Sequence, residues 1–321
     1  ELTNSIEIRR GETKELICTE DILKENKSEI FNFLKEINIL YFFEFIVIKL
    51  FFTICKILGY RLSSDLGFFI GKTVGNIFRK KTSIIGNLKK SKISIDISEN
   101  KFAKNVLGNY GRILAEYPFL KDFRNNSLSN YIEIDGIENL EKINKKNKPA
   151  VFISGHFNNF ELMAMQIEKS GINLAAIYRP LNNVFLNKDM EDIRKNYICK
   201  NQIKKGRSGT RQILENLKQG NSIALMIDQR VTEGIKINFF GDLASTTTIP
   251  AQIIKKYKCD LVPIYIERTK KHYFKMYVSQ PIVINSEKSN EEISIHLNKI
   301  LEKMILKNPD QWIWTHDRWR K

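Results

Sequence analysis

The chain has few cysteines, and none of them are paired in sequence. Its four thiols, Cys18, Cys55, Cys199 and Cys259, lie far apart among 321 residues and form no Cys-x-x-Cys pair. This spacing argues against a disulfide framework and against a zinc site, and it fits reduced thiols in the cytosol. We therefore expect no metal. A catalytic cysteine remains an alternative, although none has neighbours that would activate its thiol.

Acidic residues are scarce relative to basic ones. The chain has 36 Asp and Glu against 52 Lys and Arg, a formal net charge of +16. Such an excess favours phosphate-bearing partners, an anionic membrane surface or an acidic protein. Nucleic acid is a weaker candidate, because there is no zinc finger, no aromatic RNA-binding signature and no concentrated basic arm. With 42% hydrophobic residues, the composition indicates a globular protein.

No long apolar run is free of charge. Residues 39–60 are strongly apolar and aromatic, but Glu44, Lys49 and Lys56 interrupt them. A membrane-spanning helix needs about 20 mostly apolar residues, and a charge at mid-bilayer costs about 2.5–3.5 kcal/mol. We therefore expect a helix that lies in the membrane interface, with Lys49 and Lys56 reaching lipid phosphates while the phenylalanines enter the acyl chains. A core helix covered by protein is the alternative.

The hydrophobic pattern divides the chain into three parts. Residues 1–38 are polar, with a short helical pattern from Ile30 to Leu34, and form an extension of unknown role. Residues 39–120 are predicted to be a helical, membrane-associating region, in which residues 99–120 form an amphipathic helix that Pro118 ends. Residues 121–321 are predicted to form an α/β region that carries the candidate site, and we expect residues 39–321 to form one structural unit.

Beyond residue 120, short apolar segments alternate with helical ones. Strands are predicted at residues 131–134, 149–154, 174–178, 222–228, 261–267 and 272–278. Helices are predicted at residues 137–145, 161–169, 190–197, 210–218, 250–257 and 293–306. This alternation predicts an α/β fold whose mostly parallel sheet is flanked by helices.

The first candidate for chemistry is His156, which directly follows the apolar run from Ala150 to Gly155. Ligands bind at strand ends in α/β sheets, and an imidazole there can accept a proton near neutral pH. Glu161 completes a His-x4-acid pattern, but a chain of this composition contains about 0.4 such pairs by chance. Alone, His156 is better interpreted as a satisfied buried histidine.

Four further segments follow predicted strands. They are Tyr178–Asn183 with Arg194 on the next helix, Asp228-Gln229-Arg230, Phe239–Pro250 and Pro309–Trp314. Together with Gly155–Glu161, they resemble in order the motifs of the late acyltransferases of lipid A biosynthesis, the lauroyl and myristoyl transferase family. The resemblance covers roughly residues 40–319, and the ordered set is more specific than any single motif. One departure is Asn158-Asn159-Phe160, where many relatives have Gly-Asn and Trp.

The resemblance implies a glycerolipid-acyltransferase-like fold and an activity that needs no cofactor. The enzyme would move a fatty acyl chain from acyl carrier protein to a hydroxyl of a lipid A precursor. That acceptor is a phosphorylated, Kdo-bearing glucosamine disaccharide lipid at the cytoplasmic face of a Gram-negative inner membrane. The resemblance gives neither the acyl chain length nor the hydroxyl acylated.

The resemblance also implies roles for particular residues. His156 would be the general base, and Glu161 would hold its ring. Arg179 and Arg194 would bind substrate phosphate through their planar guanidinium groups, unless they pair with nearby acids on the surface. Asp228 and Gln229 are further substrate-binding candidates. Asp228 would orient Arg194 or a nearby loop, or it is a simple cap or turn residue.

Two other functions remain open. A glycerolipid or lysophospholipid acyltransferase also has a His-x4-acid box, but usually with Asp as the acid and with a Gly-rich phosphate-binding box, neither of which is evident here. A non-catalytic basic protein that binds membrane or nucleic acid would explain the charge. That function would leave the ordered motifs as coincidence.

Overall fold

The computed structural model describes residues 5–10, 13–18, 39–146, 148–285 and 287–320. Seven strands form the central sheet: β3 (Ile132–Asp135), β4 (Ala150–Ser154), β5 (Leu174–Tyr178), β6 (Asn201–Lys204), β7 (Ser222–Met226), β10 (Asp260–Lys270) and β11 (Tyr273–Val278). Their order is β3-β11-β10-β4-β7-β5-β6, and only the β10–β11 pair is antiparallel. The predicted α/β fold with a mostly parallel sheet is confirmed.

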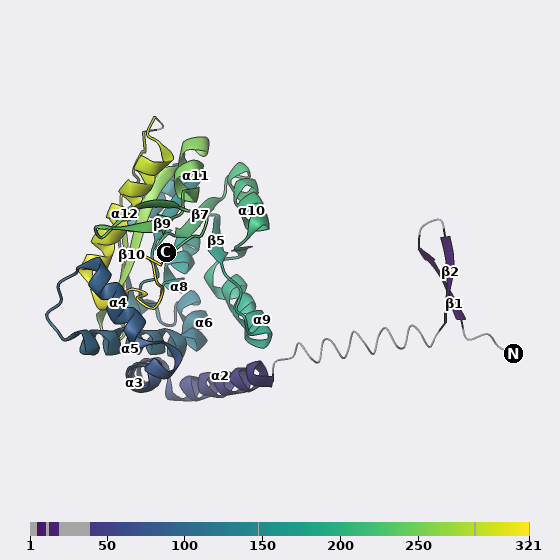
Figure 1. Ribbon diagram of the computed structural model, residues 1–321, viewed down its shortest axis with the longest axis horizontal. Helices are drawn as coiled ribbons and strands as arrows, with labels where there is room; N and C mark the ends of the chain where they lie inside the picture. The colour runs from purple at the N-terminus through teal and green to yellow at the C-terminus, as the bar shows by residue number, and fades with distance from the viewer. Residues whose placement is uncertain (1–4, 11–12, 19–38, 147, 286, 321) are drawn as a thin grey trace.

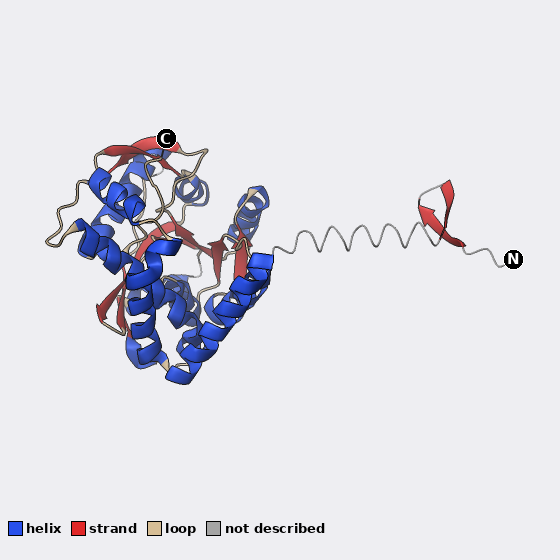
Figure 2. Cartoon of the chain, turned by 60° about the horizontal axis from the view of Figure 1, so that its bottom comes forward, coloured by secondary structure: helices blue, strands red, loops and turns tan. Residues whose placement is uncertain are grey.

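Helices flank this sheet, as Figures 1 and 2 show. Those of the α/β region are α7 (Ile137–Lys146), α8 (Glu161–Lys169), α9 (Val184–Ile193), α10 (Arg207–Lys218), α11 (Ile249–Tyr257) and α12 (Asn290–Lys307). The central strand β4 is buried at all five positions, as expected for a parallel strand covered on both faces. It leads directly to His156.

The first half of the chain adds a helical layer. It comprises α2 (Ile39–Leu58), α3 (Tyr60–Phe78), α4 (Lys81–Ser91), α5 (Glu99–Glu116), the 3₁₀ turn Tyr117–Phe119 and α6 (Leu120–Arg124). Helices α3 and α5 approach closely where Gly67 faces Gly111. A Cβ added at Gly111 would lie 1.9 Å from the Gly67 carbonyl oxygen, so only glycine fits there. This packing fixes α5, which contributes to the pocket described below.

The two lysines of α2 do not lie where the interfacial-helix prediction placed them. Lys49 Nζ binds Asp189 Oδ2 on α9 at 2.8 Å, and Lys56 Nζ binds Asp122 Oδ2 on α6 at 2.7 Å. The lysine-bearing side of the helix therefore faces the protein, and snorkelling toward lipid is wrong for these two residues. A helix covered by protein is wrong as well, because ten large apolar residues of α2 are exposed. Among the described helices, none is both long and apolar enough to cross a membrane.

Several elements differ from the predictions. Strand β6 and the antiparallel hairpin of β8 (Ile235–Phe239) with β9 (Asp242–Thr246) were not expected. Helix α9 begins earlier than predicted and continues as a π-helical turn, Arg194–Ile198. Near the N-terminus, β1 (Ser5–Arg10) pairs with β2 (Thr13–Cys18). The helical pattern from Ile30 to Leu34 lies outside the described residues.

The C-terminal tryptophans belong to the core. Trp312, Trp314 and Trp319 are buried, and Phe239 is fully buried beside Trp319. The sequence left open whether these tryptophans sit at the membrane interface or pack within the protein, and their burial places them within the protein. The segment therefore contributes structure to the site instead of a membrane anchor.

Candidate active site

His156 lies in the turn between β4 and α8. Gly155 permits this turn, because a Cβ there would lie 3.2 Å from an Asp228 carboxylate oxygen and 3.0 Å from atoms of Leu301 and Phe157. Asn158, with a φ of +41°, completes the turn in the left-handed region. The chain thus reverses tightly at the carboxyl end of a buried strand, and the His156 side chain is left about one fifth exposed at 19%.

Asp228 holds the imidazole of His156. Its Oδ1 lies 2.8 Å from His156 Nδ1, and its Oδ2 accepts the backbone N–H of His156 at 2.7 Å. The indole N–H of Trp312 donates to the same Oδ2 at 2.9 Å. Since an ionised carboxylate only accepts, Nδ1 carries the proton, and Nε2 is left as the basic nitrogen. The pair is a histidine–carboxylate dyad with the ring orientation fixed.

The dyad's surroundings set its pKa values. Burial alone would lower the pKa of His156, but the charge and hydrogen bond of Asp228, with a smaller contribution from Glu161, raise it above its ordinary value. Burial would raise the pKa of Asp228, but His156 and the indole of Trp312 lower it below its ordinary value. Asp228 is therefore ionised at neutral pH, and the imidazole can gain and lose a proton near physiological pH.

Glu161 has different partners. Its Oε1 accepts the Tyr117 hydroxyl, and it accepts Nε and Nη2 of Arg194 at 3.0 and 2.9 Å. The prediction that Glu161 holds the His156 ring is corrected, because Asp228 makes that hydrogen bond. The prediction that Asp228 orients Arg194 is corrected too, because Glu161 does so. Glu161 begins α8 and points toward the π-helical turn, a feature often found at functional sites.

Glu161, Arg194 and Tyr117 form a buried cluster, called the Glu161 cluster. The side chains of Glu161 and Arg194 are only 9% and 14% exposed. Burial would lower the pKa of Arg194, but the Glu161 charge raises it, so the guanidinium stays charged. Burial and the Glu161 charge raise the pKa of Tyr117 well above its ordinary value. The cluster is a buried ion pair with a neutral phenol, in which Arg194 Nη1 has no hydrogen-bond partner.

A second buried ion pair is hydrogen-bonded to the histidine turn. Glu116, at the end of α5, pairs with Arg268 of β10 at 2.9 Å, and both side chains are almost fully buried. Asn159 Nδ2 donates to the same carboxylate at 3.2 Å. Sequence reasoning missed both charged residues, because one lies in an amphipathic helix and the other in a strand, far from any motif. They connect the turn to the helical layer and to the sheet.

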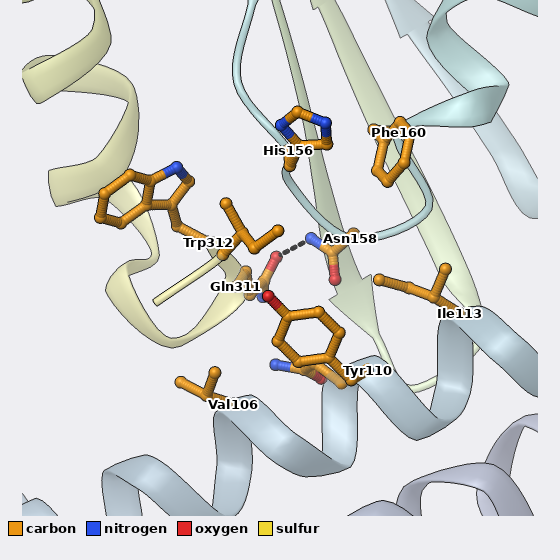
Figure 3. Close-up of a pocket in the computed structure, with 10 residues that line it drawn as sticks. Val106, Tyr110, Ile113, His156, Asn158, Phe160, Gln311 and Trp312 are labelled. Carbon is orange, nitrogen blue, oxygen red and sulfur yellow. Dashed lines mark hydrogen bonds between the residues drawn. The ribbon is translucent and has the colours of Figure 1, made fainter. Parts of the chain in front are cut away.

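The C-terminal segment closes the other side of the turn. The Asn158 backbone N–H donates to the Gln311 carbonyl at 3.1 Å, and the Asn158 and Gln311 side chains are hydrogen-bonded, as Figure 3 shows. Phe157 forms an isolated antiparallel bridge with Trp312. The predicted Pro309–Trp314 motif therefore contacts the His156 turn directly.

A mostly apolar pocket lies beside His156. Its lining residues come from α5, the histidine turn and the C-terminal segment: Val106, Asn109, Tyr110, Ile113, His156, Asn158, Phe160, Gln311, Trp312 and Ile313. Figure 3 shows Tyr110 and Ile113 facing the turn that carries His156 and Phe160. The pocket is small, about 20 Å³ in volume, and gives the imidazole an apolar wall on this side.

The remaining candidate residues lie at the same edge of the sheet. Arg179 follows β5 and is exposed, and Gln229 follows Asp228 and is half-buried. Cys55, Cys199 and Cys259 are free and buried. Burial raises the pKa of Cys199 to about 12 and that of Cys259 to about 11, so neither thiol is activated. Within the described part of the chain, no cluster of three or more His, Cys, Asp or Glu could hold a metal ion.

The fold and the site define an α/β protein with a hydrogen-bonded histidine–aspartate pair beside an apolar pocket. The family model for bacterial lipid A biosynthesis acyltransferases matches residues 30–321. The chain belongs to this family.

Two relatives illustrate the similarity. Lipid A biosynthesis acyltransferase 2 of Shigella flexneri is 24% identical over 188 residues, which are 56% of this chain and 58% of that protein. Lipid A biosynthesis palmitoleoyltransferase of Escherichia coli (strain K12) is 22% identical over 232 residues, 71% of this chain and 74% of that protein. The chain thus spans a little over half the length of the first relative.

Proposed function

We propose that this protein transfers a fatty acyl chain from acyl carrier protein to a hydroxyl of a lipid A precursor. Family membership supports the reaction class. The single observation that carries the mechanism is the His156–Asp228 dyad, which opens to an apolar pocket. The acyl carrier protein donor and the phosphorylated, Kdo-bearing acceptor come from the family resemblance. The reaction needs no cofactor, because all bonds change between the two substrates.

In the proposed reaction, His156 Nε2 takes the proton of the acceptor hydroxyl as its oxygen attacks the thioester carbonyl. The tetrahedral intermediate then collapses, the carbon–sulfur bond breaks, and the imidazolium returns the proton to the leaving thiolate. An alcohol attacks poorly unless its proton leaves in the transition state, which is why a positioned base accelerates such a step about 10²–10⁴-fold. Asp228 stabilises the imidazolium through Nδ1.

Glu161 acts at longer range in this proposal. Its negative charge raises the pKa of His156, although its oxygens bind Tyr117 and Arg194. Arg194 is consequently committed to Glu161 and holds it in place. Arg179 is exposed and stays a candidate for contact with a substrate phosphate. Gln229, next to Asp228, is positioned for a polar group of the substrate.

The exposed apolar face of α2 and α3 is proposed to contact the cytoplasmic leaflet of the inner membrane. A patch this large on a soluble surface usually marks an interaction site, and a lipid substrate must leave a bilayer to reach His156. The residues are Ile39, Leu40, Phe42, Phe43, Ile46, Val47, Leu50, Ile54, Ile57, Leu58, Leu62, Phe69, Val74, Ile77 and Phe78.

The catalytic proposal is tested with purified full-length protein, acyl carrier proteins loaded with chains of several lengths, and the lipid A precursor. Release of carrier thiol and the mass of the acylated lipid are measured. We expect His156→Ala to lower kcat about 10²–10⁴-fold. The matched control is His296→Ala, an exposed histidine of α12. Equal activity of the two variants would contradict the proposal, and transfer only to lysophospholipid would favour the glycerolipid alternative.

The membrane proposal is tested by sedimentation with anionic vesicles. Phe43→Glu/Val47→Glu places two charges on neighbouring turns of the exposed side of α2, and vesicle binding should fall by at least about tenfold. Leu243→Glu/Val283→Glu adds the same charge at two exposed apolar residues of the α/β region. The proposal fails if both double variants bind vesicles as the wild type does.

A further inference from the structure

Four parallel strands deliver positively charged or proton-accepting residues to one edge of the sheet. His156 follows β4, Arg179 follows β5, Lys205 follows β6, and Arg230 lies shortly after β7. These strands are neighbours in the order β4-β7-β5-β6. The carboxyl edge next to His156 is therefore basic.

Lys205 is fixed at the carboxyl edge of the sheet by its backbone. Its N–H donates to the Tyr178 carbonyl at 2.8 Å, which places it beside Arg179. Burial is the largest influence on the pKa values of His156 and His316 and lowers both. The positive charge of Lys205 lowers both pKa values further. Its ammonium group is thus within electrostatic range of the two imidazoles.

Arg230 is anchored through the second of these imidazoles. Its backbone N–H donates to His316 Nε2 at 2.9 Å, so His316 is neutral with its proton on Nδ1. Burial lowers the pKa of His316, which agrees with this protonation state. The Arg230 Nε is buried and has no hydrogen-bond partner in the structure. A buried donor of this kind costs free energy until an acceptor binds it.

The charges of these two residues are not neutralised by the protein. In the part of the chain that the structure describes, neither Lys205 nor Arg230 forms an ion pair. Asp228, two residues before Arg230, is already engaged by His156 and Trp312. Neither cation lines the apolar pocket of Figure 3. Lys205 and Arg230 thus lie at the same sheet edge as His156 but outside its apolar pocket.

We propose that Lys205 and Arg230 bind a phosphate group of a substrate next to His156. The proposal rests on the proposed function, since both substrates carry phosphate: the acceptor on its disaccharide, the donor in its phosphopantetheine arm. A guanidinium and an ammonium that reach the same anion from strands on either side of β5 would each supply charge-assisted hydrogen bonds. Phosphate held here would fix the position of the reacting group relative to Nε2.

The experiment compares Lys205→Ala/Arg230→Ala with Lys142→Ala/Lys145→Ala, a double variant of equal charge. The control residues are exposed on α7, which packs against β11 near the other end of the sheet. KM and kcat are measured for intact and dephosphorylated acceptor, and for acyl carrier protein and acyl pantetheine without phosphate. We expect the KM of the phosphate-bearing substrate to rise about 10- to 100-fold in the site variant.

The substrate arms identify the source of the phosphate. If the acceptor supplies it, the KM difference between wild type and site variant disappears with dephosphorylated acceptor. If the donor supplies it, the difference disappears with acyl pantetheine. The proposal is overturned if the site variant matches the control variant with all four substrates.

A titration with inorganic pyrophosphate separates this proposal from the proposed function. If the wild type transfers no acyl chain, the proposed function fails and calorimetry alone decides the phosphate site. Binding by the wild type and the α7 control, with at least tenfold weaker binding by the site variant, would support it. Equal binding by all three proteins, or no binding by any, would overturn it.

Discussion

Two buried carboxylates lie near His156, and they have different hydrogen-bond partners. Asp228 accepts the imidazole, the backbone N–H of His156 and the Trp312 indole. Glu161 accepts Tyr117 and Arg194, and acts on His156 only through its charge. The carboxylate closest in sequence is therefore not the one that holds the ring. Position in the sheet decides this pairing more strongly than spacing along the chain.

Strand register explains the difference. Ser154 of β4 pairs with Met226 of β7, and the ladder continues as Ile227 N–H donates to the Ser154 carbonyl at 2.9 Å. His156 and Asp228 each lie two residues beyond this pair, so they emerge side by side. Glu161 lies five residues further along, beyond the turn, at the first residue of α8. Its carboxylate meets Arg194 instead.

The largest effect is expected for Asp228→Asn. The amide removes the charge that stabilises the imidazolium, and it can hold the wrong tautomer, so kcat should fall about 10²–10⁴-fold. Steady-state kinetics of acyl transfer measure this loss. Glu161→Gln should retain more activity than Asp228→Asn. The reverse order would mean that the sequence-adjacent acid is the functional partner.

Glu161→Leu should affect stability more than Glu161→Gln does. It leaves the buried Arg194 guanidinium unpaired, which costs about 3–5 kcal/mol of unfolding free energy. Replacing both partners, as in Glu161→Leu/Arg194→Met, should recover most of that loss, because no buried charge remains. Urea denaturation of the single and double variants measures the recovery. A double variant as unstable as the single one would show that the unpaired Arg194 charge does not cause the loss of stability.

The smallest effects are expected for two substitutions that each remove one hydrogen bond to one of the carboxylates. Trp312→Phe removes a donor to Asp228 and should lower kcat by about tenfold, since a hydrogen bond to a charged group contributes about 1.5–3 kcal/mol. Tyr117→Phe removes a donor to Glu161 and should leave kcat within about twofold while lowering stability by about 1–2 kcal/mol. Parallel kinetics and melting curves test this pair. Similar kcat losses in both variants would contradict the different roles assigned to Asp228 and Glu161.

Much of the α/β region could be predicted because its signals are local. The helix Glu161–Lys169 and the strand Leu174–Tyr178 have the predicted bounds, since periodicity and burial agree there. Strand β6 was missed because Asn201–Lys204 is short, polar and at the sheet edge. The β8–β9 hairpin was missed because its turn residues, Phe240 and Gly241, do not form a typical hairpin signal.

The residues of the site could be predicted from the sequence, but which of them pair with each other could not. His156, Glu161, Arg194 and Asp228 are in two adjoining clusters, but the residue pattern alone does not show which carboxylate faces which cation. Strand order was needed for that, and order depends on contacts between distant segments. The same reason hid Glu116 and Arg268, a pair 152 residues apart, and the lysine-bearing face of α2. Amphipathicity shows that a helix has two faces without showing what covers each.

The most direct test measures the pKa of His156 by ¹⁵N NMR in the wild type, Asp228→Asn and Glu161→Gln. In the wild type this pKa lies above its ordinary value, so the neutral base forms, and activity rises, as pH increases through that raised value. We predict that both substitutions lower the pKa, and that Asp228→Asn lowers it further, moving the acidic limb of activity to lower pH. A larger fall in Glu161→Gln, or an unchanged pKa in Asp228→Asn, would contradict the assignment of Asp228 as the partner of His156.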